Sequence, residues 1–239
     1  MAKRSKKTTR KKVRKRPLRR RILRWLTLGA VGAAAFVCLV VLAGRIINPP
    51  TTIFMVQESR RLGGIERQWA PIEQIAPVMA RSVVAAEAAN FCLHWGFDLD
   101  AIRQAIEAGA NRGASTLTQQ TVKNVYLWHG RSWLRKALET GLTLLVEALW
   151  PKERILEIYL NIAEFDEGVF GVEAAAQAAF GLSAKDLTAT QAARLAAVLP
   201  NPKARSAAKP SARLRQRAAA IADGAATIAK DERAACFDS

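Results

Sequence analysis

The stretch AAEAANFCLHWG, residues 85–96, carries a single carboxylate, Glu87, among four alanines. A lone acid in a mostly apolar stretch is either a helix-surface residue or a partly desolvated general acid or base. Phe91 and Trp95 are expected to form an apolar wall beside it. His94 is interpreted as a structural, hydrogen-bonding histidine rather than as a catalyst. Glu87 is therefore the first candidate for acid–base chemistry.

A second polar group lies in RGASTLTQQTVKN, residues 112–124. On a helix that begins at Ser115, the residues Thr116, Gln120 and Lys123 follow at i, i+4 and i+7 and share one face. That face offers a hydroxyl, an amide and an ammonium but no acid, which suits an anionic ligand such as a phosphate or pyrophosphate. A solvated helix face is the alternative from spacing alone.

Arg135, Lys136 and Glu139 form the third group. Arg135 and Glu139 are four residues apart, which is the spacing of an exposed helical ion pair. The functional alternative is a second cationic patch with a carboxylate among its cations. Such a patch could hold a leaving phosphate, or a divalent metal that bridges Glu139 and phosphate oxygens. The pair Glu87 and Glu139 would also suit glycosyl chemistry.

Helices are expected to carry all three groups, because apolar residues downstream of residue 75 mostly recur at helical spacing. Thr188 and Gln191 predict a capping box at the start of one of these helices. A short strand is expected at 53–56, and the fold class is all-α. The expected helices cover residues 75–89, 98–108, 115–127, 132–150, a segment starting near Pro151, a segment from Thr188 to before Pro200, and 211–230.

The 239-residue chain has a formal net charge of +17, and this charge is concentrated at the N-terminus. Of the 37 Lys and Arg residues, 14 lie in the acid-free residues 1–24, and the remaining 23 nearly balance 20 Asp and Glu. Residues 25–44 are uncharged and long enough to span about 30 Å of hydrocarbon as a helix. We expect an uncleaved anchor, with the tail in the cytoplasm and residues 45–239 on the other side. A buried core helix is the weaker alternative.

Cysteine and histidine usage argues against several kinds of site. Cys38, Cys92 and Cys236 are odd in number and widely spaced, so no disulfide framework is expected. The chain has no CxxC pair, and its two histidines lack metal-ligand spacing. The basic tail adjoins the apolar span and lacks interleaved aromatic residues, which favours membrane orientation over nucleic-acid binding.

Together these motifs resemble those of the glycosyltransferase family 51 peptidoglycan polymerases. AAEAANFCLHWGFD resembles the first family motif, E-D-x-x-F-x-x-H-x-G, and RGASTLTQQTVKN resembles the second, G-G-S-T-x-x-Q-Q-x-x-K-N. RKALE, KERILEIYLN and GVFGVEAAAQAAFG resemble the third, fourth and fifth motifs. The five motifs keep the family's order within a motif core at 80–202. We expect a monofunctional member, because 239 residues leave no room for the transpeptidase domain of two-domain relatives.

The resemblance implies a lysozyme-like, two-lobed glycosyltransferase domain behind one N-terminal transmembrane helix, with the smaller lobe embedded in the membrane. It implies that lipid II, a disaccharide-pentapeptide on undecaprenyl pyrophosphate, is polymerised into β-1,4 glycan strands. The reaction inverts the anomeric carbon and releases undecaprenyl pyrophosphate. By matched position, Glu87 is the general base for the acceptor hydroxyl, and Glu139 acts at the pyrophosphate or its metal. Donor sugar and pyrophosphate are expected at Ser115, Thr116, Gln120, Lys123, Arg135 and Lys136.

The resemblance also implies cofactors, partners and a location. Mg²⁺ or Mn²⁺ is the expected cofactor, with Glu139 as a candidate ligand, and no organic cofactor is expected. The expected partners are lipid II, the growing glycan strand and the lipid bilayer, with cell-division or elongation proteins as further candidates. The expected location is the cell inner membrane, single-pass, with a cytoplasmic N-terminus and a periplasmic catalytic domain.

Two positions depart from the family motifs. Ala114 stands where the second motif usually has Gly, and Ala88 stands where the first motif has Asp. Because neighbouring helical residues point about 100° apart, the missing Asp would not have duplicated the role of Glu87. Ala88 leaves open a catalytically impaired scaffold of the cell-wall synthesis machinery. The other alternative is a lysozyme-like hydrolase, which the cationic residues disfavour because hydrolysis needs no pyrophosphate cradle.

Overall fold

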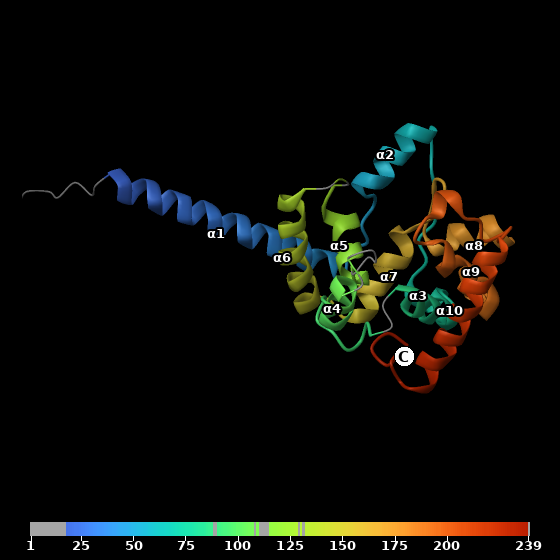
Figure 1. Ribbon diagram of the computed structural model, residues 1–239. Coiled ribbons are helices and arrows are strands. Elements are labelled where there is room, and N and C mark those ends of the chain that lie inside the picture. Colours follow the sequence, from blue (N-terminus) through green and yellow to red (C-terminus); the bar gives the residue numbers. More distant parts are fainter. Residues whose placement is uncertain are drawn as a thin grey trace, which may run out of the picture. The chain divides into compact units, whose positions relative to one another are not determined.

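The computed structural model describes residues 18–87, 90–107, 109, 115–128, 130 and 132–238, with the side chains of 101, 105 and 106 left out. The chain divides into two compact units, Met1–Val40 and Val41–Ser239. Helices dominate the described residues (Figure 1), which confirms the all-α class. The basic residues 1–17 and the motif positions Ala88 and Ala114 lie outside the described residues.

The first unit contains most of helix α1 (Leu18–Gly44), which is 27 residues long. At a rise of 1.5 Å per residue such a helix reaches about 40 Å, which exceeds the hydrocarbon core of a bilayer. Within the described residues it is the one helix whose length and hydropathy suffice to cross a membrane. This apolar helix fits a single-pass anchor. The domain boundaries at 24/25 and 44/45 stay predictions.

The second unit contains the helices that carry the candidate site. They are α2 (Ile53–Leu62), α3 (Pro77–Glu87), α4 (Leu99–Glu107), α5 (Leu117–Tyr126), α6 (Trp133–Leu149), α7 (Lys152–Ile162), α8 (Val172–Phe180), α9 (Ala189–Val198) and α10 (Ala212–Lys230). Short 3-10 turns lie at Ile72–Gln74, Ala184–Asp186 and Pro202–Ala204.

Local signals in the sequence explain most of these boundaries. The Thr188–Gln191 capping box at the start of α9 is confirmed. Helix α5 has a capping box as well, but its N-cap is Thr116 rather than the expected Ser115, and Gln119 completes the box. The hydroxyl of a cap residue satisfies a backbone N–H that the first helical turn leaves unpaired. Helix α8 was not expected from the sequence.

The strand expected at 53–56 is wrong, because these residues begin helix α2. Thr52 caps that helix by accepting a hydrogen bond from the backbone N–H of Met55. The strands of this unit lie elsewhere, at β1 (Glu66–Arg67), β2 (Glu164–Asp166) and β3 (Val169–Phe170). They form a small sheet of order β1-β3-β2, in which β1 pairs parallel and β2 antiparallel with β3. Three strands of two or three residues leave the all-α class unchanged.

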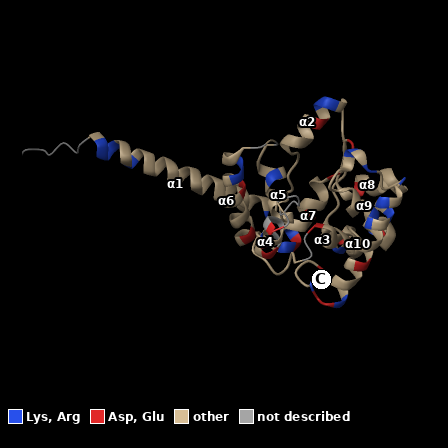
Figure 2. Ribbon diagram, in the orientation of Figure 1, with Lys and Arg blue, Asp and Glu red and all other residues tan. Residues whose placement is uncertain are grey.

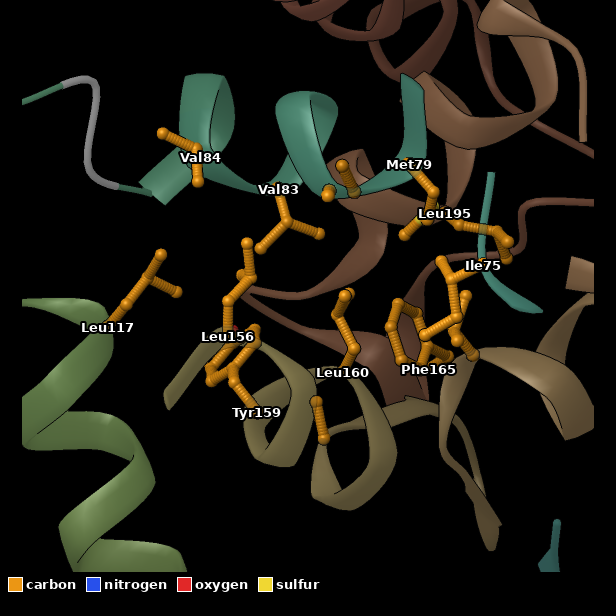
Figure 3. Close-up of a cluster of buried hydrophobic side chains, with 14 of the residues drawn as sticks. Ile75, Met79, Val83, Val84, Leu117, Leu156, Tyr159, Leu160, Phe165 and Leu195 are labelled. Carbon is orange, nitrogen blue, oxygen red and sulfur yellow. The ribbon is translucent and has the colours of Figure 1, made fainter. Parts of the chain in front are cut away.

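Part of the core lies between α3, α5 and α7, and α9 and α10 extend it on the other side of α3. Val83 and Val84 of α3 face Leu156 and Tyr159 of α7, and Leu117 of α5 lies beside them (Figure 3). All of these side chains are buried. Close packing of this kind fixes the helices that carry the polar residues of the candidate site.

No disulfide framework was expected from the number and spacing of the cysteines, but the structure contains one disulfide. Cys92 and Cys236 are joined by a disulfide with Cα atoms 5.7 Å apart, across 144 residues of sequence. Cys38, exposed on α1, is free. Spacing along the chain could not predict this bond, because it depends on α10 returning the C-terminus to the segment that follows Glu87.

Candidate active site

Glu87 is the last residue of α3, and it is half-buried. The side-chain amide of Gln120 in α5 donates a hydrogen bond from Nε2 to Glu87 Oε2 over 3.0 Å. The Tyr159 hydroxyl of α7 donates in turn to Gln120 Oε1 over 3.4 Å. Because Tyr159 occupies the amide oxygen, the amide NH₂ of Gln120 is directed at the carboxylate. Three helices thus orient Glu87 and leave its Oε1 without a donor among the described residues.

Burial raises the pKa of Glu87 above its usual value, because a charged carboxylate loses hydration there. The hydrogen bond from Gln120 and the charges of Arg217 and Arg205 oppose this rise in pKa. Burial and the charge of Glu87 also raise the pKa of Tyr159 well above its usual range, so its hydroxyl stays a donor. A carboxylate with a raised pKa and one free oxygen suits a general base.

Glu139 of α6 is almost fully buried, with 3% of the residue exposed. Arg135 Nη1 lies 2.6 Å from Glu139 Oε2, and the Lys136 ammonium pairs with the other oxygen, Oε1. Arg135 also donates a 2.9 Å hydrogen bond from its Nε to the carbonyl of Gly130, which fixes the guanidinium. The exposed ion pair considered from spacing is therefore wrong, because the carboxylate of this pair is buried.

Lysine and arginine residues lie on both α5 and α6 (Figure 2). Lys123 of α5 lies close enough to Arg135, Lys136 and Glu139 for their charges to act on it, and these four residues are here called the cationic cluster. Burial lowers the pKa of Lys123, Glu139 raises it, and Arg135 and Lys136 lower it further. Glu139 pairs directly with Arg135 and Lys136, and its charge also acts on Lys123. The cluster has an excess of positive charge, which favours an anion with several oxygens.

Helix α5 links the base to the cationic cluster. Gln120 faces Glu87, and Lys123, three residues on, responds to the charges on α6. Residues three apart lie on one side of a helix, and α5 packs against both α6 and α7. The shared face predicted for Gln120 and Lys123 therefore places a base and an anion-binding cluster along the same helix.

The segment Asn90–Gly96, here called the motif-one segment, is tied to α5 and α6. The Thr116 hydroxyl donates to the carbonyl of Gly96 over 2.7 Å. Gly96 has a φ of +74°, and a Cβ added there would lie 2.6 Å from Thr143 Cγ2. Only glycine tolerates both this backbone conformation and the close approach of α6. Thr116 therefore has a structural role as cap and tether, and its role in substrate binding stays a prediction.

Lys152, at the start of α7, holds the same segment. Its Nζ donates to the carbonyl of His94 over 2.7 Å and pairs with Glu147 Oε2 at 2.8 Å. The ammonium also lies 4.6 Å from the ring centroid of buried Phe91. Phe91 and His94 contact each other edge to face. This network could not be predicted from spacing, because it depends on the packing of α6 and α7 against the motif-one segment.

The remaining predicted site residues have mixed outcomes. Ser115 is exposed just before the cap of α5. Neither buried ring nitrogen of His94 has a hydrogen-bond partner among the described residues, so the hydrogen-bonding role expected for its ring is not seen there. Trp95, expected beside Phe91, is largely exposed. The role of Phe91 as a wall for Glu87 stays a prediction.

Arginines near Glu87 were missed by sequence reasoning. Arg205, Arg213 and Arg217 line a cavity of about 370 Å³ at α10 and the turn before it. Arg205 is held by a 3.0 Å hydrogen bond to the carbonyl of Ala197. An alanine-rich helix with scattered arginines looks like a solvated surface, and only the packing of α10 on α3 reveals that Arg217 acts on Glu87.

Comparisons with known proteins identify the family of the chain. The family model described as Transglycosylase matches residues 56–226. A protein of Jannaschia sp. (strain CCS1) named biosynthetic peptidoglycan transglycosylase is 59% identical over 237 residues, covering 99% of each chain. Proteins of the same name from Rhodospirillum centenum and Xanthomonas campestris are 46% and 47% identical, covering 91% and 84% of this chain and 96% and 87% of their own.

The family match spans the helices that carry Glu87, Lys123, Arg135 and Glu139. It also agrees with the lysozyme-like fold class expected from the motifs. The length of the match and the identity of relatives that align over nearly the whole chain place this protein without ambiguity: it belongs to the transglycosylase family.

Proposed function

We propose that this peptidoglycan glycosyltransferase polymerises lipid II into β-1,4 glycan strands and releases undecaprenyl pyrophosphate. One observation carries the proposal. A carboxylate with a raised pKa, Glu87, and a cluster of cations around the buried Glu139 are joined through one helix, α5. A base and a site for a polyanionic leaving group are the two requirements of glycosyl transfer from a pyrophosphate.

In this mechanism Glu87 accepts the proton of the acceptor's GlcNAc 4-hydroxyl. The hydroxyl oxygen attacks the anomeric carbon of the donor from the face opposite the pyrophosphate, and a new glycosidic bond forms with inversion. The bond from that carbon to the pyrophosphate oxygen breaks, and its electron pair leaves with the pyrophosphate. Lys123, Arg135 and Lys136 neutralise the charge that develops there. Gln120 holds Glu87 in position by its 3.0 Å hydrogen bond.

A divalent metal fits the described side chains poorly. Both oxygens of Glu139 already accept from Arg135 and Lys136. The described residues contain no group of three His, Cys, Asp or Glu side chains able to hold a metal ion. Hard cations such as Mg²⁺ prefer several oxygen ligands. We therefore assign charge neutralisation to the three cationic side chains and no step to a metal.

Membrane attachment through α1 would place this site at the surface where a lipid-linked substrate lies. Helix α6 presents exposed apolar residues, among them Trp133, Leu134 and Leu138, which suit contact with the bilayer. We place the N-terminus in the cytoplasm because of its basic residues. The Cys92–Cys236 disulfide supports a catalytic unit in an oxidising compartment, the periplasmic side of an inner membrane.

The test of this function uses the purified full-length protein and labelled lipid II in detergent. We expect a polymer that lysozyme digests. Its initial rate of formation should be proportional to the concentration of the protein. A wild-type protein that makes no polymer, where a characterised relative does, would refute the proposed activity and favour the scaffold. Release of soluble fragments from isolated cell walls would instead support the hydrolase.

Replacing Arg217 by glutamine is expected to change the pH dependence of polymerisation. The charge of Arg217 lowers the pKa of Glu87, so its removal raises that pKa further. Because the ionised carboxylate is the active form, the acidic limb of kcat/KM should move to higher pH. The matched control is Arg215→Gln, an exposed arginine on the same helix that binds the carbonyl of Pro210. An unmoved limb in Arg217→Gln would contradict the charge coupling.

A further inference from the structure

The C-terminal segment Glu232–Asp238, here called the C-terminal clamp, is joined covalently to the motif-one segment. The Cys92–Cys236 disulfide ties the clamp to a position five residues after Glu87. The next residue, Phe237, is 5% exposed, and its ring centroid lies 6.2 Å from that of Phe91. A disulfide and an aromatic contact at adjacent residues fix both the distance and the orientation of the two segments.

The clamp also holds the chain on the other side of Glu87. Asp238 Oδ2 lies 2.6 Å from Arg81 Nη1, and both side chains are partly buried. Arg81 lies on α3, six residues before Glu87. Helix α10, which leads into the clamp, packs against the end of α3, where a Cβ added at Gly224 would lie 3.2 Å from Ala85 Cβ. The clamp therefore contacts the chain both before and after the base.

Two residues from different parts of the chain contact the ring of Phe91. Lys152 lies 4.6 Å from its ring centroid, and Phe237 contacts the ring as well. Lys152 belongs to α7 and is fixed by Glu147, whereas Phe237 belongs to the clamp. Loss of the clamp would leave the motif-one segment held through α5, α6 and α7 alone, with more freedom next to Glu87.

We propose that the C-terminal clamp positions the motif-one segment beside the catalytic base, and that Cys92, Cys236 and Phe237 are positioning residues for the glycosyl transfer. The Cys92–Cys236 disulfide therefore belongs to the active-site framework, in addition to any stabilisation of the whole fold. The proposal rests on the proposed function for its activity readout, while the disulfide and the local order of the segment are measured independently.

The experiment compares the oxidised full-length protein with its Cys236→Ser, Cys92→Ser and Cys38→Ser variants. Cys38 is the matched control, because it is the free cysteine of α1. All assays run well below the lowest melting temperature of the set. In Cys92→Ser and Cys236→Ser we expect kcat to fall by about tenfold to a hundredfold, as small misplacements of reacting groups do. KM for lipid II should stay within about twofold, because the cationic cluster is untouched.

Three further readouts separate positioning from general stability. The acidic limb of the pH profile should move to lower pH, since a looser segment admits water to Glu87 and removes part of the burial that raises its pKa. Reduction by dithiothreitol should reproduce the loss in wild type and in Cys38→Ser, and reoxidation should restore the rate. The Cys236→Ser rate should not respond to either treatment. Phe237→Ala should lower kcat with the disulfide intact.

Several outcomes would overturn the proposal. Mass spectrometry could find Cys92 and Cys236 as free thiols in protein purified without reductant. Alternatively, Cys236→Ser could keep the wild-type kcat and pH limb. If neither the wild type nor any variant polymerises lipid II, the proposed function fails. The positioning role of the C-terminal clamp is then tested by hydrogen exchange alone. Faster exchange at residues 90–96 in Cys236→Ser than in Cys38→Ser supports it, and equal exchange refutes it.

Discussion

Replacing Glu87 by glutamine is expected to lower the polymerisation rate by about a hundredfold to ten-thousandfold, the usual contribution of a general base. Glutamine has the same shape as glutamate but cannot accept a proton from the acceptor hydroxyl. Its side-chain oxygen can still accept the hydrogen bond from Gln120 Nε2 that orients Glu87. The measurement is the initial rate of polymer formation from labelled lipid II at saturating substrate.

The same substitution is expected to leave the melting temperature unchanged or slightly raised. The pKa of Glu87 is raised by burial, so the folded protein holds its proton at pH values where the unfolded chain has lost it. The free energy of unfolding of the wild type therefore falls as pH rises through the interval between the unfolded and folded pKa values. Glutamine lacks this titration, so the variant gains stability relative to wild type above that interval.

The control for this prediction is Glu73→Gln, the same chemical change at an exposed glutamate just before α3. It should alter neither the polymerisation rate nor the melting temperature. A Glu87→Gln protein that polymerises at the wild-type rate would remove Glu87 from the mechanism. Loss of both activity and folding would show that Glu87 has a structural role.

Helices in this chain were predictable where short-range signals agree. The helical spacing of apolar residues within 132–150 predicted α6, and Thr188 with Gln191 predicted the start of α9. The prediction failed where tertiary contacts decide. Residues 53–56 are β-branched or large, yet the Thr52 cap and the burial of Met55 make them helical. Strand β1 pairs with β3 across about 100 residues, a relation that no local pattern encodes.

The candidate site was only partly predictable for the same reason. Spacing placed Arg135 and Glu139 together, because residues four apart on a helix always meet. Spacing could not decide that Glu139 is buried, since that depends on the packing of α6. The hydrogen bond between Gln120 and Glu87, the effect of the Arg217 charge on Glu87 and the Cys92–Cys236 disulfide all join distant parts of the chain. The resemblance to the family motifs predicted which residues form the site. How these residues act together depends on the fold.

Replacing Glu139 by glutamine is expected to damage both stability and activity, unlike the change at Glu87. The carboxylate is the shared anion of Arg135 and Lys136, and it also acts on Lys123. A glutamine oxygen can accept from one of these cations but neutralises none of them. Removal of one partner from a buried ion pair costs about 3 kcal/mol or more. Thermal unfolding should therefore show a melting temperature several degrees below that of wild type.

Inorganic pyrophosphate offers a test of why Glu139 is there. In the variant, three cations lack their carboxylate, so an added polyanion should bind more tightly than in wild type. Because a ligand of the folded state stabilises it by mass action, pyrophosphate should raise the melting temperature of Glu139→Gln more than that of wild type.

The control is Glu107→Gln, the same change at an exposed glutamate, which should behave as wild type. Polymerisation should stay slow even with the fold restored, because a tightly held pyrophosphate leaves slowly. Equal stabilisation of both proteins would contradict the assignment of this cluster to the leaving group. Under the proposed mechanism, Glu139 keeps three cations together in the free enzyme yet leaves enough positive charge to receive the departing pyrophosphate.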